Sequence, residues 1–308
     1  HWTIIDPLAL TAGVSYDQVR SPDNFRFAPI NNREDRKDQW SPKGGIVWTP
    51  WNDTTVRGAY TRSLGGVSLD QSFRLEPTQM AGFNQSFRSL VPESVAASAA
   101  TPQFETWGAG LDHKFATGTY AGVEGELLNS DQDRVFSAYS ITPGLFGLPA
   151  AGSATQVDLR ERQFYVEKNL SVYLNQLVGD EWALGARYRL SDASLAFRYD
   201  QAPAYDRDFE ATIQQLNLFT LYNHRCGFFA RTESLWTMQS NRQQSPAGPG
   251  DNFWQFNLLL GYRLPRRAAE FQIGVLNLTD RDYQLSPVSL YADLPHERTF
   301  IASIKLNF

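Results

Sequence analysis

Apolar and polar residues alternate strictly along much of this chain, and its closing segment shows the pattern most clearly. Successive side chains of a β-strand point to opposite faces, so the alternation predicts a strand with one apolar face and one polar face. Within the last ten residues only Ile301 departs from it. The apolar face carries Phe300, Ala302, Ile304, Leu306 and Phe308, and the polar face carries Thr299, Ser303, Lys305 and Asn307.

The same alternation returns in eleven further segments, which predicts about twelve strands in all. Their polar faces carry oppositely charged side chains and glycine, whereas their apolar faces carry tryptophan and tyrosine near the strand ends. This distribution is typical of a membrane barrel with aromatic girdles and a wet interior, rather than of a soluble β-sandwich. We therefore predict an all-β fold, namely a transmembrane antiparallel up-and-down β-barrel. The expected strands cover 10–17, 40–49, 54–62, 106–115, 121–127, 160–177, 181–190, 212–222, 228–238, 254–263, 268–278 and 299–308.

Connector lengths support the barrel independently, because transmembrane barrels alternate short periplasmic turns with long extracellular loops. The connectors keep this order along the chain, and the short ones are rich in Pro, Asn, Asp and Gly, which suit tight turns. The phase places both chain ends in the periplasm. The expected short turns are 50–53, 116–118, 178–180, 223–225 and 264–267, and the expected long loops are 18–39, 63–103, 131–159, 191–211, 239–251 and 279–297.

Composition narrows the class further. With 308 residues and no Pro/Gly/Ser linker, the chain is expected to form a single domain over 1–308. No run approaches the roughly 18 apolar residues that a spanning helix needs, so a membrane location requires a barrel. The net charge is 28 minus 33, or −5, which argues against a nucleic-acid partner. The single cysteine, Cys226, cannot form an internal disulfide.

Enzyme chemistry and metal binding find little support in the residues. The four histidines lack a serine two positions away on the same strand face, so no catalytic residue is assigned. The acidic triplets 131–133 and 206–208 offer oxygen ligands, but such loop carboxylates are usually solvated, so neither a metal site nor a cofactor is predicted. The charged run 33–38 is expected on an outer loop, facing lipopolysaccharide head groups.

Three segments resemble outer-membrane receptors. VLNLTDRDY at 275–283, with PHERTF at 295–300, resembles the last hairpin of TonB-dependent receptors. WSPKGG at 40–45, with TTVRGAYTRS at 54–63, is similar to a mid-barrel hairpin of that family, and LEPTQMAGFNQ at 75–85 is similar to barrels that follow tetratricopeptide repeats. The resemblance implies the bacterial outer membrane. It implies as partners the membrane lipid and lipopolysaccharide, the barrel-assembly machinery, and either a TonB-type energy coupler or a periplasmic repeat domain.

The chain also departs from the receptor pattern. No plug or energy-coupling box is visible before the first strand, and about 22 strands are usual where twelve are expected here. Residues 1–5, followed by the turn at Asp6 and Pro7, read as the tail of a descending strand. We therefore expect the chain to be the C-terminal portion of a longer protein.

The function expected from this pattern is a transport channel that takes up a ligand in the manner of TonB-dependent receptors. Two alternatives stay open: an export or diffusion porin attached to a periplasmic repeat domain, and a surface anchor or adhesin that acts through its long loops. Loop aromatics are expected either to stack on a ligand or to pack a loop down as a lid: Phe73, Phe83 and Phe87. The C-terminal assembly signal is expected in Phe300, Ile304, Leu306 and Phe308. Strand phase predicts that the following residues line the lumen, either acting on a solute or only bonding across the wall: Asp17, Arg57, Asp112, Lys114, Glu124, Glu126, Arg187, Arg189, Arg231, Glu233 and Lys305.

Overall fold

The fold is one large antiparallel sheet, seen in a computed structural model that describes residues 2–5, 7–22, 33–65, 79–85, 90, 101–143, 149–242, 250–265, 268–283, 285 and 297–306. Thirteen strands form the sheet, and a two-stranded hairpin, β5–β6, lies apart from it. The strands are β1 (Trp2–Ile5), β2 (Leu8–Pro22), β3 (Glu34–Trp51), β4 (Thr54–Leu64), β5 (Gln79–Met80), β6 (Phe83–Asn84), β7 (Gln103–Lys114), β8 (Thr119–Pro143), β9 (Pro149–Val178), β10 (Trp182–Tyr199), β11 (Arg207–Asn223), β12 (Phe228–Arg242), β13 (Asn252–Arg263), β14 (Ala269–Leu276) and β15 (Thr299–Leu306).

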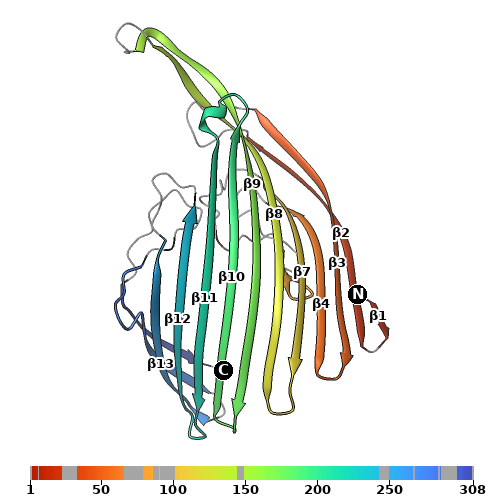
Figure 1. Cartoon of the computed structure of the whole chain (residues 1–308), viewed down its shortest axis with the longest axis vertical. Coiled ribbons are helices and arrows are strands. Elements are labelled where there is room, and N and C mark those ends of the chain that lie inside the picture. The colour runs from red at the N-terminus through yellow and green to blue at the C-terminus, as the bar shows by residue number, and fades with distance from the viewer. Residues whose placement is uncertain are drawn as a thin grey trace.

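Each strand pairs with its neighbours in chain order, apart from β4, which pairs with β7 across the small hairpin. This is the up-and-down order expected from the sequence. The twelve expected strands are all present, and the expected strand tail at the start of the chain is β1. Within the described residues the order runs from β1 to β15 without a pairing between these two edge strands. Figure 1 shows the strands side by side as a curved wall.

Short and long connectors lie at opposite ends of the wall. Tight turns join β7 to β8, β9 to β10 and β11 to β12, and each contains a glycine with positive φ, at Gly118, Gly179 and Gly227. Only glycine adopts such φ values readily, which explains its place in these turns. The C-terminus lies at this short-turn end (Figure 1). We call the opposite end the long-connector end.

Two of the expected long loops are wrong, because strands occupy most of their length. The range 131–159 is largely the hairpin of β8 and β9, and 191–211 is largely β10 and β11, joined through a short 3-10 helix, η3 (Pro203–Tyr205). β9 has 30 residues. At about 3.3 Å per residue it extends for roughly 100 Å, whereas about 9–11 residues cross a bilayer. β8 and β9 accordingly project beyond the other strands at the long-connector end (Figure 1).

The two faces of the sheet exchange polarity along these long strands. We call the face that carries Arg57 and receives hairpin β5–β6 the inner face, and the opposite one the outer face. Toward the long-connector end the inner face becomes an apolar core, in which each side chain is at most 6% exposed. The core consists of Phe104, Leu128, Tyr165, Ala193, Leu195, Phe197, Phe209 and Ala211, with Leu90 and Tyr199 packed against it.

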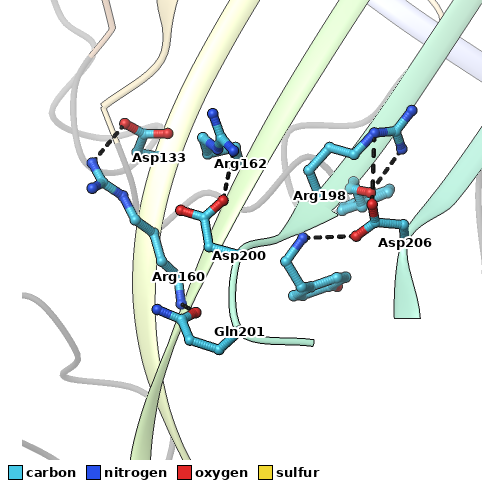
Figure 2. Close-up of polar contacts among 9 residues, drawn as sticks. Asp133, Arg160, Arg162, Arg198, Asp200, Gln201 and Asp206 are labelled. Carbon is cyan, nitrogen blue, oxygen red and sulfur yellow. Dashed lines mark hydrogen bonds and ion pairs between the residues drawn. The ribbon is translucent and has the colours of Figure 1, made fainter. Parts of the chain in front are cut away.

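The outer face becomes polar at the same level. Cross-strand ion pairs join Asp133 to Arg160 at 3.2 Å and Arg162 to Asp200 at 2.5 Å, as Figure 2 shows. Farther along the same face Arg198 pairs with Asp208 at 2.5 Å. Asp133 and Asp208 belong to the two acidic triplets, and each pairs with an arginine. Within the described residues no group of three or more side chains has the arrangement of a metal site.

Nearer the short-turn end the outer face is apolar and exposed. Large side chains there include Trp51 at 70% exposure, Trp40 at 64% and Leu174 at 52%. An apolar band spread over so many adjacent strands would be costly in water and is what lipid stabilises. No helix long and apolar enough to span a bilayer occurs in the described part of the chain.

Candidate functional site: the inner wall around Arg57

Arg57 is the centre of a polar network on the inner face. Its guanidinium donates from Nε to Asp112 at 2.8 Å and from Nη2 to Glu124 at 3.0 Å. The Tyr173 hydroxyl donates to the other oxygen of Asp112 at 2.6 Å. The antiparallel register of β4, β7, β8 and β9 brings these four residues together although they are far apart in sequence. The network therefore fixes the arginine in one orientation on the wall.

The β5–β6 hairpin packs on this arginine. Arg57 Nη1 donates to the carbonyl oxygen of Ala81 at 3.2 Å, and the guanidinium carbon lies 5.2 Å from the centre of the Phe83 ring. A cation over an aromatic face at this distance is attractive. Phe83 is only 1% exposed, so its ring packs the connector onto the wall and is inaccessible to a ligand. Of the two roles expected for Phe83, packing is the one its position allows.

Glycines on the wall make room for the hairpin. A Cβ added at Gly108 would meet the Phe83 ring at 2.4 Å, and one at Gly45 would meet Met80 at 3.0 Å. Within the hairpin, Ala81 and Gly82 have positive φ values of 48° and 91°. A Cβ at Gly82 would lie 2.2 Å from Arg57 Nη1. The hairpin can thus approach the wall this closely because glycines on both surfaces lack a side chain.

Beside the hairpin lies a cavity of about 460 Å³. Asn84 of β6 forms part of its lining, and β7 to β12 of the wall supply the rest. Among the described uncharged side chains of this lining, Thr106 Oγ1 and Asn217 Oδ1 are buried without a hydrogen-bond partner. The charged side chains of the lining are Glu124, Glu126, Glu167, Arg187 and Arg189, and its other amides and hydroxyls include Asn169, Ser171 and Gln215.

Glu167 marks the border between the cavity and the apolar core. It is 1% exposed, and it accepts hydrogen bonds from the Tyr165 hydroxyl at 2.5 Å and from Asn169 Nδ2 at 2.7 Å. Arg189 Nη2 lies 3.8 Å from Glu167 Oε1. Because a buried carboxylate is costly unless it is bonded, these partners are what permits a charge at the base of the core.

A second buried carboxylate, Glu161, lies nearer the long-connector end. It pairs with Arg134 at 2.7 Å and accepts a hydrogen bond from the Tyr199 hydroxyl at 2.7 Å. Burial, followed by this hydrogen bond, raises the pKa of Tyr199 above its ordinary value. On the outer face nearby, burial and the neighbouring Asp133 raise the pKa of Asp131.

The structure brings six of the predicted lumen residues to one place and leaves the others apart. Asp17 Oδ2 accepts a hydrogen bond from Ser41 Oγ at 3.3 Å, and Lys114 Nζ lies 5.8 Å from the centre of the Tyr120 ring. Arg231 pairs with Glu233, and Lys305 is exposed on edge strand β15. The six that gather around the hairpin and cavity are Arg57, Asp112, Glu124, Glu126, Arg187 and Arg189.

Some predicted residues fall elsewhere or outside the description. Phe73, Phe87 and Phe308 lie outside the described residues. Of the expected assembly signal, Phe300, Ile304 and Leu306 are 74%, 67% and 55% exposed. The sequence interpretation missed Glu161, Glu167, Tyr173 and Thr106. The spacing of Tyr165, Glu167, Asn169, Ser171 and Tyr173 puts all five on one strand face, which was the available signal.

Comparisons with known proteins support the barrel interpretation. Residues 1–96 match the family model described as TonB dependent receptor-like, beta-barrel. The ferripyoverdine receptor of the Pseudomonas aeruginosa outer membrane, bound to ferripyoverdine, aligns with a TM-score of 0.56 at 14% identity, covering 94% of this chain and 40% of that one. The ferric enterobactin receptor PfeA of the same species, in complex with enterobactin, aligns with a TM-score of 0.52 at 13% identity, covering 92% of this chain and 42% of that one. No curated protein matches the sequence.

The chain thus spans about two fifths of the length of these receptors, and it shares their fold. The predicted resemblance to TonB-dependent receptor barrels is confirmed. With its apolar outer face, the chain has the fold of part of an outer-membrane β-barrel wall. The matched family comprises transport receptors and not enzymes.

Proposed function

We propose that this chain forms part of the wall of an outer-membrane channel that takes up a ligand in the manner of TonB-dependent receptors. The observation that carries the proposal is the division of the sheet into an apolar outer face and a charged inner face around Arg57, Glu124 and Arg187. A wall with lipid on one side and paired charges on the other is suited to hold a wet passage. On this proposal the predicted lumen residues line that passage, and a TonB-type coupler supplies the energy.

A diffusion channel is the second candidate, and the β5–β6 hairpin favours it. Part of the connector between β4 and β7 already occupies the inner side of the wall, held by Arg57 and Phe83. A connector fixed in this way narrows a passage permanently, as a passive size filter requires. This candidate needs no energy coupler.

Transport by the full-length protein separates the two candidates. Cells that carry it, with and without the energy-coupling protein, would be supplied with iron-55 loaded on pyoverdine or on enterobactin, the ligands of the structural neighbours. Parallel liposomes would be tested for leakage of radiolabelled sucrose. Coupler-dependent iron uptake supports the receptor, and leakage without energy supports the diffusion channel. If neither occurs, the channel proposal is overturned.

A further inference from the structure

We infer that the cavity between hairpin β5–β6 and the inner wall binds an uncharged, hydroxyl-rich solute such as a short sugar. The inference rests on the proposed function, since it assigns a class of solute to the inner side of the same wall. It starts from the cavity's volume of about 460 Å³, which lies within the range usual for sites of small molecules.

Most of the charges around the cavity already have a partner. Glu167 lies 3.8 Å from Arg189, and Glu124 binds Arg57, a guanidinium that it shares with Asp112. Glu126 and Arg187 complete the charged lining. A charged solute entering here would gain little net attraction and would have to compete with an existing ion pair. An uncharged solute has no such cost, so the electrostatics favour neutral molecules.

The uncommitted groups of the cavity suit hydroxyls. Thr106 is 4% exposed, and its Oγ1, like Oδ1 of Asn217, has no hydrogen-bond partner among the described residues. Leaving a buried polar atom unbonded is costly, and a bound hydroxyl would remove that cost. An amide offers an acceptor beside two donors. Asn217 can therefore accept from a solute hydroxyl through Oδ1, and Asn84, whose Oδ1 already accepts from Gln79 at 3.0 Å, can donate to one through its NH2 group.

The cavity is complete only when hairpin β5–β6 is docked on the wall. Asn84 belongs to β6, directly after Phe83, and Phe83 is fixed between Arg57 and Gly108. When the ring is in place, Asn84 completes one side of the cavity. Displacing Phe83 therefore removes a binding group as well as a constriction, so the hairpin determines both solute affinity and passage width.

Binding by the purified full-length protein in detergent tests the inference without any need for transport. Isothermal titration would compare lactose and maltose with the anionic disaccharide lactobionate and the cationic glucosamine disaccharide. The variants are Thr106→Val and Asn217→Leu. Thr237→Val is the matched control, since Thr237 is also fully buried with an unpartnered hydroxyl but lies outside the cavity. The folded fraction of each variant is measured from its heat-modifiable band.

We expect saturable binding of a neutral disaccharide, at least fivefold weaker binding of both charged ones, and at least a fivefold loss in Thr106→Val and Asn217→Leu but not in Thr237→Val. The inference is overturned if neither neutral sugar binds saturably, if a charged disaccharide binds more tightly, or if the control loses as much as the cavity variants. Failure of the transport experiments with sugar binding intact would overturn the proposed function and leave the site standing.

Discussion

The ring of Phe83 lies under the guanidinium of Arg57, 5.2 Å from its carbon atom, and this contact joins a connector of the long-connector end to the middle of the inner wall. Arg57 thus has two tasks, since it also balances Asp112 and Glu124. This combination of contacts requires an arginine, because only a planar guanidinium can donate to carboxylates from its edge while its face covers an aromatic ring.

Replacing Arg57 with glutamine should release the hairpin. The change removes the cation–π contact and leaves two carboxylates without their cation, at a cost of about 1.5–3 kcal/mol for each charged hydrogen bond lost. A cysteine at Asn84, in a background where Cys226 is serine, should then react with a maleimide at least severalfold faster than when Arg57 is present. An unchanged reaction rate would mean that Arg57 does not hold the hairpin.

Gly108→Ala should displace Phe83 without touching any charge. The added methyl group would lie 2.4 Å from the ring, which has to move. Gly44→Ala is the matched control, because a Cβ at Gly44 meets nothing within 4 Å. In planar bilayers the full-length Gly108→Ala variant should show a larger single-channel conductance than wild type, and Gly44→Ala should not. Equal conductance in both would show that the hairpin does not constrict the passage.

The native cysteine reports topology. Cys226 is exposed in the turn between β11 and β12, at the short-turn end that we predict to face the periplasm. In intact cells an impermeant maleimide should leave Cys226 unlabelled, and labelling should appear once the outer membrane is permeabilised. A cysteine placed at Asp206, with Cys226 replaced by serine, should show the reverse. Labelling of Cys226 in intact cells would invert the assignment.

Adjacent positions on β9 should respond oppositely to arginine. Val172 lies on the outer face and is 44% exposed, so Val172→Arg should cost roughly 2–4 kcal/mol if this level is the bilayer midplane. Ser171 lies on the polar inner face between Glu124 and Arg189, so an added cation there meets one carboxylate and one guanidinium and does not enter lipid. Ser171→Arg should therefore cost much less. Urea unfolding in lipid vesicles measures both, and similar losses at the two positions would contradict the assignment of faces.

The bond between Tyr199 and Glu161 should make stability depend on alkaline pH. Because the folded pKa of Tyr199 is raised, its contribution is complete below the unfolded pKa of about 10 and is lost as pH rises through the folded value. Tyr199→Phe should therefore cost about 1.5–3 kcal/mol at pH 8, and the gap from wild type should narrow above pH 10. Urea unfolding at several pH values tests this, and a gap that widens with pH would refute it.

The sequence predicted the strands well, because side chains alternate wherever one face meets lipid. It did not predict that the strands continue past the bilayer. Beyond Leu190 the outward residues Asp192, Ser194 and Arg198 are polar while Ala193, Leu195 and Phe197 turn inward, so alternation persists with its sense reversed. We interpreted the polar residues there as loops.

The candidate site was predictable only in part. Strand phase placed Arg57, Asp112 and Glu124 on one face, and the register of β4, β7 and β8 then brought them within hydrogen-bond distance. The docking of hairpin β5–β6 was not predictable, since it depends on Gly45, over which Met80 packs, and on Gly108, over which Phe83 packs, from strands distant in sequence. A glycine in a strand does not itself reveal which side chain will fill its space.

The exchange of polarity along β8 to β11 has a consequence for how this protein divides into parts. Domain borders normally cut a chain once, in a linker between two folding units. Here the border between lipid-facing and water-facing structure runs across the strands, so β9 alone has Leu174 in the lipid-facing part and Arg160 in the other. No deletion of one continuous segment can remove the water-facing part and leave the lipid-facing part whole. Each of these strands contributes residues to both parts.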